Sequence, residues 1–297
     1  MIEGPRHPAL SGVHIFLAAA EYGSFTRAAA ILGLPQSSVT RQIAALEDAV
    51  GCRLFERHRR GALLTHEGIR YRDEVKPAVD RIWLATRRLR RRDTDRELRL
   101  RVYPTFATRW LLRRLQAFNT YAPGVTVSLD AAAEPVDFAC HDVDLAIQFG
   151  SGQWHGAAAE LLFPDEVEPV CTPDLLRRVG PFGAVDDLSK ALLLQSRYRR
   201  DDWQDWLAAN TESWPQLRTM EFGSSVLTFQ ACLDGLGVAM GQPLLLETEL
   251  ADKRLLRPMQ RPLRRPHLGY YLISPAGRRM TMPARRFATW IRDAAAA

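Results

Sequence analysis

Lysine and cysteine are scarce in this chain. Only 3 of its 40 basic residues are Lys, and its 4 cysteines lie far apart with no C-x-x-C pair among them. That spacing argues against a zinc ribbon and against a thioredoxin-like redox site. Because reduced cysteine is among the most buried residue types, we expect Cys52, Cys140, Cys171 and Cys232 to be buried free thiols.

The sequence also lacks a long hydrophobic run. A membrane-spanning helix needs about 18 to 20 consecutive apolar residues, and no segment of the chain approaches that length. The first ten residues, MIEGPRHPAL, contain no apolar stretch of the kind found in secretory signal peptides. These absences predict a cytoplasmic protein with no membrane partner.

What is present indicates two folded parts of different charge. The chain has 297 residues, 46% hydrophobic and 25% charged, which at roughly 150 residues per domain suggests about two globular domains. Residues 1–96 hold 17 basic and 11 acidic side chains, whereas residues 97–297 hold 23 of each. A basic part followed by a neutral one is typical of a protein that binds a polyanion with one part only.

Three helices are predicted in the first fifty residues. Apolar side chains recur at helical spacing over residues 10–22 and 25–32, and a Gly follows each run. Pro35 suits the first position of a third helix, which ends at Val50. The apolar stripe of this third helix consists of Val39, Ile43, Leu46 and Val50.

The opposite face of the third helix is small and polar. It carries Ser37, Ser38, Thr40, Arg41, Ala44 and Asp48. Such a face suits entry into a DNA major groove, because short side chains allow close approach and Arg41 can bond a guanine bidentately. The plain alternative is a solvated helix face. Next, two short apolar runs flank the basic turn 58–61, which predicts a hairpin, or wing, with its tip on phosphates.

Residues 23–68 carry motifs at fixed spacing: Ser24-Phe25-Thr26, Ala28-Ala29, Leu46-Glu47, Gly51, Leu54-Phe55-x-Arg57 and Leu64-Thr65. Together they resemble the winged helix-turn-helix of LysR-type transcriptional regulators. The resemblance implies that the third helix reads the major groove and that the wing contacts the DNA backbone. It assigns reading and positioning to Ser37, Ser38, Thr40, Arg41 and Gln42, and phosphate contacts to Thr26, Arg53, Arg57 and Arg59.

Residues 65–92 again have helical periodicity. Their apolar stripe, at coiled-coil-like spacing, consists of Val75, Val79, Ile82 and Leu89. Pro77 should remove a hydrogen bond and bend the helix. A single amphipathic helix with little of its own body to pack against favours a partner helix from a second chain, and the resemblance implies a linker helix that dimerises.

The remaining two thirds alternate strands and helices, which predicts a parallel α/β sheet. Strands are expected near 98–102, 125–130, 144–149, 167–171, 192–195, 220–222, 238–240 and 268–273. Ligands of open α/β sheets bind beyond the carboxyl ends of the strands. That rule selects Thr105, Phe106, Gln148, Phe149, Ser224 and Ser225. A helix beginning at Ser225 favours an anionic group such as a carboxylate.

Motifs in this region include Tyr103-Pro-Thr-Phe-Ala107, Val143-Asp-Leu-Ala-Ile147 and Phe222-x-Ser-Ser225. They resemble the effector domain of LysR-type regulators, a two-lobed fold similar to periplasmic solute-binding proteins, and look closest to the branch of glycine-cleavage activators and β-lactamase-inducer regulators. The resemblance implies that Asp137 and Tyr271 also belong to the effector cleft. Gln148 stands where many relatives have Arg.

Three other functions were considered. Two glycine motifs, beginning at Gly150 and Gly235, have one residue too many for a dinucleotide fingerprint, and no nucleophile or metal motif occurs, so we expect no enzyme activity, cofactor or metal. A transported-solute binder would need export and has no reason for a basic helix-turn-helix. An architectural DNA-binding protein without an effector remains open, and binding of a small molecule by the C-terminal part would distinguish it.

The expected protein is therefore an α/β regulator with three parts. They are a winged helix-turn-helix at 1–66, a dimerising linker helix at 67–96 and an effector-binding domain at 97–297. Within the last, lobe I is expected at 97–168 and 267–297, and lobe II at 169–266. The expected partners are double-stranded promoter DNA, a small-molecule effector, further copies of the chain and RNA polymerase. A homotetramer is predicted, with a dimer as the alternative.

Overall fold

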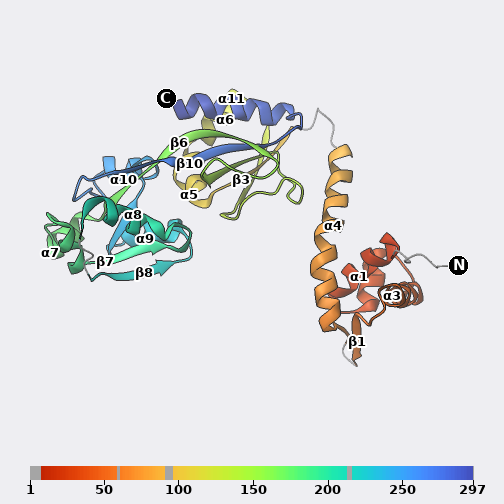
Figure 1. Ribbon diagram of the computed structural model, residues 1–297. Helices are drawn as coiled ribbons and strands as arrows, with labels where there is room; N and C mark the ends of the chain where they lie inside the picture. The colour runs from red at the N-terminus through yellow and green to blue at the C-terminus, as the bar shows by residue number, and fades with distance from the viewer. Residues whose placement is uncertain (1–7, 59–60, 91–95, 213–215, 297) are drawn as a thin grey trace. The chain divides into compact units, whose positions relative to one another are not determined.

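The computed structural model describes residues 8–58, 61–90, 96–212 and 216–296. The chain divides into two compact units, Met1–Arg91 and Arg92–Ala297. In Figure 1 the first unit is coloured red to orange and the second runs from yellow to blue. None of the helices in the described residues is long and apolar enough to cross a membrane.

The first unit contains three short helices, a two-stranded hairpin and one long helix. Their bounds are α1 Leu10–Tyr22, α2 Phe25–Leu32, α3 Gln36–Val50, β1 Phe55–His58, β2 Gly61–Leu64 and α4 His66–Arg90. Gly23 and Gly33 end α1 and α2 with φ of 59° and 65°, a left-handed conformation that glycine adopts without strain. The Ser24 hydroxyl accepts a hydrogen bond from the Arg27 amide and so caps α2.

Aromatic rings and aliphatic side chains from α1, α2, α3 and β1 form the core of this unit. The Phe55 ring contacts Phe16 and Phe25 at centroid distances of 5.4 and 5.1 Å. Val39, Ile43 and Leu46 are buried as the stripe predicts. Val50 is instead 36% exposed, because the packed part of the stripe ends at Leu46.

The wing is attached to the helices at both ends. The Glu47 Oε1 accepts hydrogen bonds from the amides of Leu54 and Phe55 at 2.8 and 3.1 Å. On the other strand, the Ala62 amide donates to the Gly23 carbonyl at 3.0 Å. The hairpin therefore keeps a fixed orientation relative to α3.

Helix α4 continues through Pro77 without interruption. Its first half packs on α1, where the Tyr71 ring meets Phe16 at 5.4 Å, and Val79 is buried. Farther along, Ile82 and Trp83 are 46% and 47% exposed. An apolar surface of this kind is what a helix that pairs with another chain would present.

The second unit is built on one sheet with helices on its faces. Its strands are β3 Glu97–Val102, β4 Thr126–Ala131, β5 Leu145–Gly150, β6 Ala157–Val170, β7 Leu192–Ser196, β8 Arg218–Phe222, β9 Val238–Gly241 and β10 Leu263–Pro275. Its α-helices are α5 Pro104–Phe106, α6 Leu115–Tyr121, α7 Pro173–Val179, α8 Asp201–Asn210, α9 Ser225–Leu233, α10 Glu247–Ala251 and α11 Met282–Ala296. Shorter or irregular turns are η1 Ala107–Leu111, η2 Leu112–Arg114, η3 Val185–Lys190, η4 Arg197–Arg199 and η5 Pro243–Leu246.

The strand order is β4-β3-β5-β10-β6-β9-β7-β8, and the sheet is mixed rather than wholly parallel. β3 pairs in parallel with β4 and β5, and β7 with β8 and β9, but β10 runs antiparallel to both β5 and β6. The prediction of a parallel sheet was therefore correct for each end and wrong for the middle. The alternation of helices and strands along the sequence does not reveal the antiparallel strands, because the same alternation occurs around long antiparallel crossovers.

Strands β6 and β10 carry the chain from one half of the sheet to the other. We call the half with β4, β3 and β5 lobe I and the half with β9, β7 and β8 lobe II. In the β6–β10 ladder, Arg265 pairs with Asp165 and the next pair is Gly269 with Pro164. Residues 266–268 therefore have no partner in β6 at the crossover.

Helices α6 and α11 cover one face of lobe I, where Phe118 contacts Phe287 and Trp290 at about equal ring distances of 5.2 Å. None of the four cysteines, all of which lie in the described residues, forms a disulfide. Cys171 and Cys232 are buried, and burial raises the pKa of their thiols to about 11 and about 12. Cys52 and Cys140 are only partly buried, contrary to expectation.

Gly68 offers a test of how the wing joins α4. A Cβ at this position would lie 2.1 Å from the Leu54 carbonyl oxygen, so Gly68→Ala must displace backbone. We expect a loss of about 1 to 3 kcal/mol in the stability of the first unit, typical of overpacking. Native-state hydrogen exchange of α1 and α3 measures it. Gly223→Ala, which meets nothing within 4 Å, should change stability by less than about 0.5 kcal/mol, and equal effects of the two would contradict this packing.

Candidate DNA-binding face and interlobe site

The outward face of α3 has the composition that the sequence predicts. Ser37, Arg41, Ala44 and Asp48 are exposed, and Ser38, Thr40 and Gln42 are partly exposed. The Gln42 side chain is held against α1, since its Oε1 accepts a hydrogen bond from the Ser11 hydroxyl at 3.3 Å. The free part of the face therefore centres on Arg41.

Two of the four residues predicted to contact phosphates are exposed on segments next to α3. Thr26 is exposed in the first turn of α2, and Arg53 is exposed between α3 and β1. The backbone of Arg53 is fixed because its carbonyl accepts a hydrogen bond from the Thr65 hydroxyl at 2.8 Å. Arg57 belongs to β1, but its side chain lies outside the described residues, as does Arg59 entirely.

At the end of β3 the chain turns into α5, and the two predicted residues there have different surroundings. Thr105 is 1% exposed in this first turn. Phe106 is 0% exposed, with its ring stacked on Trp110 at 5.0 Å and tilted against Tyr270 at 5.0 Å. Phe106 is therefore part of the lobe I core, and it packs under the end of β3 rather than facing a ligand.

Gln148 holds a loop in place. Its Oε1 accepts a hydrogen bond from the Val136 amide at 2.8 Å, and its Nε2 donates to the Glu134 carbonyl at 2.6 Å. With the side chain 2% exposed and both ends of the amide occupied, Gln148 fixes the loop after β4. Asp137 has a similar local role, because its Oδ1 accepts from the Ala139 amide at 2.7 Å.

Tyr271 and its neighbour Tyr270 point to opposite faces of β10, as successive strand residues do. Tyr271 pairs with Gln148 and lies against Trp154, at a ring distance of 5.4 Å. The Tyr270 ring instead lies 5.4 Å from Phe149 and 6.0 Å from Tyr103. The sequence reasoning selected Tyr271, whereas Tyr270 and Tyr103 are the tyrosines that gather with Phe149.

Ser224 and Ser225 are adjacent but differ in their contacts. The Ser224 hydroxyl accepts a hydrogen bond from the Leu227 amide and caps α9. Ser225 is 4% exposed, and its buried Oγ has no hydrogen-bond partner among the described residues. α9 contacts α5 across the two lobes. Burial raises the pKa of the Tyr103 hydroxyl, while the charge of Arg199 and an interaction with the Ser225 hydroxyl lower it, so Tyr103 is the polar group beside the Ser225 Oγ although the two make no hydrogen bond of ordinary geometry.

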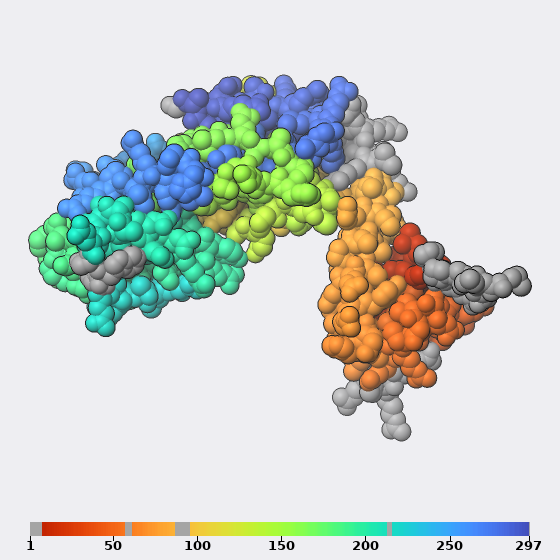
Figure 2. Space-filling view, in the orientation of Figure 1, coloured from red at the N-terminus to blue at the C-terminus, as the bar shows by residue number. Residues whose placement is uncertain are grey.

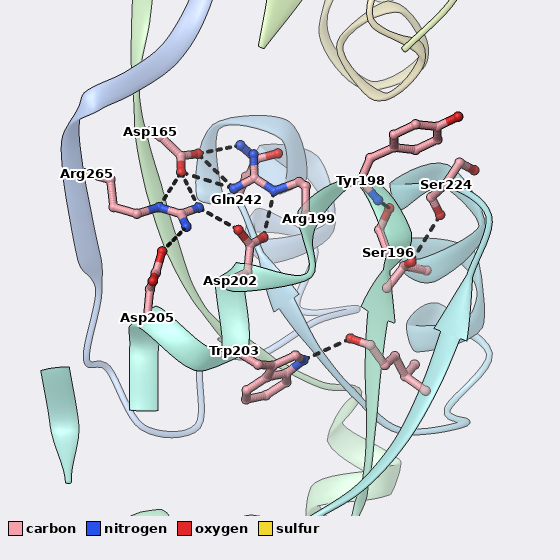
Figure 3. Close-up of polar contacts among 12 residues, drawn as sticks. Asp165, Ser196, Tyr198, Arg199, Asp202, Trp203, Asp205, Ser224, Gln242 and Arg265 are labelled. Carbon is pink, nitrogen blue, oxygen red and sulfur yellow. Dashed lines mark hydrogen bonds and ion pairs between the residues drawn. The ribbon is translucent and has the colours of Figure 1, made fainter. Parts of the chain in front are cut away.

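A buried ionic network fills the crossover between the lobes (Figure 3). The Asp165 carboxylate accepts hydrogen bonds from Arg199 at 3.1 Å, from Arg265 Nε at 2.8 Å and from Gln242 Nε2 at 2.7 Å. Asp202 accepts from both guanidinium groups, at 2.6 Å from each. Burial lowers the pKa of Arg199, but Asp202 and Asp165 outweigh that effect and raise it above its ordinary value.

Residues of this network reach lobe I from lobe II. The Arg199 guanidinium lies over the Phe149 ring at 4.1 Å from its centroid, a cation–π contact. The neighbouring Tyr198 hydroxyl donates a hydrogen bond to Glu134 Oε1 at 3.1 Å. The Glu134 carboxylate accepts one hydrogen bond from its own backbone amide and another from Tyr198, and both keep the pKa of Glu134 below its ordinary value. Arg199 is not among the residues selected from the sequence, and the spacing of three residues between Arg199 and Asp202 is the one signal that could have found this pair.

A hollow of about 380 Å³ lies beside the network, lined among others by Phe149, Tyr198, Arg199 and His267. One nitrogen of Arg199, Nη1, is buried and has no hydrogen-bond partner within the described residues. Those residues contain no group of three or more His, Cys, Asp or Glu placed to hold a metal ion. The arrangement suits reversible binding of a polar organic molecule.

Comparison with known proteins identifies both units. The family model described as "Bacterial regulatory helix-turn-helix protein, lysR family" matches residues 10–69, and the one described as "LysR substrate binding domain" matches residues 91–296. Over 298 residues the chain is 35% identical to the glycine cleavage system transcriptional activator of Escherichia coli K12, covering 98% of this chain and 95% of that protein.

Solved structures agree. The effector domain of the transcriptional regulator AmpR of Pseudomonas aeruginosa matches with 30% identity and a TM-score of 0.60, covering 67% of this chain and 95% of that one. ArgP from Mycobacterium tuberculosis shares the fold, with 22% identity and a TM-score of 0.62 over 100% of this chain and 98% of its own. The first two relatives confirm the branch that the sequence motifs indicated.

The importance of the ionic network can be measured with Asp165→Asn. This substitution keeps the shape of the side chain but leaves Arg199 and Arg265 with less compensating charge in a buried place. We expect a loss of about 3 to 5 kcal/mol, as is typical when one partner of a buried ion pair is removed, measured by urea unfolding of the full chain. Asp174→Asn breaks an exposed pair with Arg177 and should cost less than about 1 kcal/mol. Similar small losses in both variants would contradict a structural role for Asp165.

Proposed function

We propose that this chain, which belongs to the LysR family of bacterial transcriptional regulators, reads promoter DNA with α3 and senses a small molecule between lobes I and II. Regulators of this family are not enzymes, and both family models match here. The single observation that carries the sensing role is the buried Ser225 Oγ at the start of α9, which makes no hydrogen bond of ordinary geometry within the described residues and lies beside Tyr103 of the other lobe.

The proposed reading residues are those on the free face of α3. Arg41 supplies a planar donor for a base edge, and Ser37, Ser38 and Thr40 supply short hydroxyls beside it. Gln42 acts by holding α3 against α1. Thr26, Arg53, Arg57 and Arg59 are proposed to contact phosphates, since such contacts fix the position of the reading helix without selecting sequence.

The proposed effector site lies where the two lobes face each other. Thr105, Tyr103 and Phe149 contribute from lobe I, and Ser225 contributes from the first turn of α9. Free amides at a helix start favour a negatively charged or strongly polar group. Phe106, Gln148, Asp137 and Tyr271 are proposed to position this site, and Ser224 keeps the first turn of α9 in shape.

We further propose the division of the chain that its sequence suggests, with a head at 1–66, a linker helix at 67–96 and an effector-binding part at 97–297. Lobe I comprises 97–168 and 267–297, and lobe II 169–266, which agrees with the crossover near Asp165 and residues 266–268. Exposed Ile82 and Trp83 support pairing of α4 with a second copy. Two such dimers would form a homotetramer in the cytoplasm, with RNA polymerase as a further partner.

The proposed function is tested by measuring binding to the DNA upstream of the chain's own gene and to random DNA over a range of salt concentrations. A regulator gives a specificity ratio well above one at physiological salt, together with a steep log–log salt slope. Footprints with and without extract of host metabolites then show whether the spacing of protected half-sites changes. Equal binding to both DNAs under every condition, extract included, would contradict the proposal.

Substitutions on the head should separate reading from backbone contact. Arg41→Ala is expected to weaken specific binding by about 1 to 3 kcal/mol and to relax sequence choice at one position. Arg53→Ala should weaken binding to specific and random DNA alike. It should also decrease the magnitude of the slope of log affinity against log salt by about 0.9. Titrations by fluorescence anisotropy on both DNAs measure these effects. The reverse pattern would mean that the reading face has been placed incorrectly.

The two serines of α9 make a matched pair for the effector site. Ser224→Ala removes a helix cap and should lower stability by about 1 kcal/mol. Ser225→Ala removes a buried hydroxyl that makes no hydrogen bond of ordinary geometry among the described residues, so Tm without ligand should change less than in Ser224→Ala. The footprint of Ser225→Ala should no longer respond to metabolite extract. A normal response in this variant would show that Ser225 does not contact the effector.

A further inference from the structure

The C-terminal segment of the second unit is strongly basic within a unit that has no net charge overall. Residues 276–296 contain five Arg and a single acidic residue, Asp293, whereas residues 97–297 hold 23 basic and 23 acidic side chains. The segment consists of the turn after β10 and the helix α11, which forms the blue outer surface of lobe I in Figure 2. Genome-wide preference for Arg over Lys does not explain why the excess charge is local.

Four of these arginines form what we call the basic patch: Arg278, Arg279, Arg285 and Arg286. The last three are exposed, and no hydrogen bond or ion pair of their side chains occurs among the described residues. Arg278 is partly buried, and its Nη1 is a fully buried nitrogen without a partner in the same set of residues. Arg292, farther along α11, differs because it is paired with Glu160 at 2.7 Å.

The position of the patch works against the stability of the helix that carries it. α11 begins at Met282 and has no acidic residue in its first turn, where Arg285 already adds positive charge. Cations near a helix start are unfavourable, because the backbone amides there carry the positive end of the helix dipole. On the exposed face of α11, Asp293 lies two turns beyond Arg286. Unfavourable local charge without compensation is typical of a binding surface.

We propose that the basic patch binds the phosphate backbone of duplex DNA, so that the second unit adds its own sequence-independent grip to that of α3. Guanidinium groups bond phosphate oxygens bidentately, and the positive end of the α11 dipole favours the same anion. Carboxylates of an acidic protein would accept from the same donors, but DNA is the polyanion that the head brings to this chain. The proposal rests on the DNA-binding function, because the head keeps a duplex at high effective concentration for the patch.

The experiment uses the full chain and a duplex of random sequence. The double variant Arg285→Ala/Arg286→Ala removes two proposed phosphate contacts from exposed positions. The matched control Arg177→Ala/Arg178→Ala removes the same charge from α7, where Arg177 is paired with Asp174 and Arg178 donates to the Gly235 carbonyl at 3.0 Å. Affinity is measured over a range of salt concentrations, and thermal unfolding checks that both variants fold.

The slope of log affinity against log salt is negative. We expect its magnitude to decrease by about 1.8 in the patch variant, at roughly 0.9 per phosphate contact, and to stay at the wild-type value in the control. An unchanged slope in the patch variant would overturn the proposal, and so would an equal fall in both, which would reflect net charge alone. A variant that keeps the wild-type slope but no longer activates transcription would point to an acidic protein partner and would also overturn it. Failure of the proposed function is distinguishable, because it appears in the wild-type chain as absence of sequence preference.

Discussion

The arrangement of the second unit depends on how its own side chains compensate the negative charge of Asp165. Its carboxylate lies in the interior at the crossover of β6 and β10 and accepts hydrogen bonds from two arginines and a glutamine. A charge that is removed from water is tolerated only when such partners surround it. The consequence reaches both lobes, since Arg265 comes from β10 and Arg199 from the turn after β7. The same contacts that satisfy Asp165 therefore set the position of the strand ends that face the proposed effector site.

The lobes are joined by strands β6 and β10 and by the ionic network around Asp165. These connections make the junction stiff in some directions and leave it free in others. Residues 266–268 have no ladder partner, so the backbone can bend there without breaking strand pairs. On the side of the proposed effector site, the hydrogen bond of Tyr198 with Glu134 lies at the exposed surface. A ligand that contacts Ser225 and Thr105 together can shift the lobes only by the difference between its affinities for the two arrangements. The buried Ser225 hydroxyl, which makes no hydrogen bond of ordinary geometry among the described residues, suits such a difference because a bound ligand can give it one.

The head could be predicted from the sequence almost residue by residue, because its determinants are local. Gly23 and Gly33 mark helix ends, Ser24 marks a cap, and the period of Val39, Ile43 and Leu46 defines the buried face. Much of the effector site could not be predicted, because it depends on pairing between distant strands. A shift of one residue along β10 exchanges Tyr270 for Tyr271 and reverses the face. Similarly, nothing near Gln148 in the sequence indicates that residues 134 and 136 would occupy both ends of its amide.

The composition of the basic patch has a further meaning for regulation. Its four members are all Arg, and the side chain of Arg keeps its charge at any physiological pH and is not a substrate for lysine acetylation. Of the three lysines in the chain, Lys76 and Lys190 are paired with Asp80 and Asp187. Neither proton concentration nor acylation of amines can therefore tune the positive charge of the basic patch. Under the proposed function, the position of that charge, set by the lobes and their ligand, is what can still change.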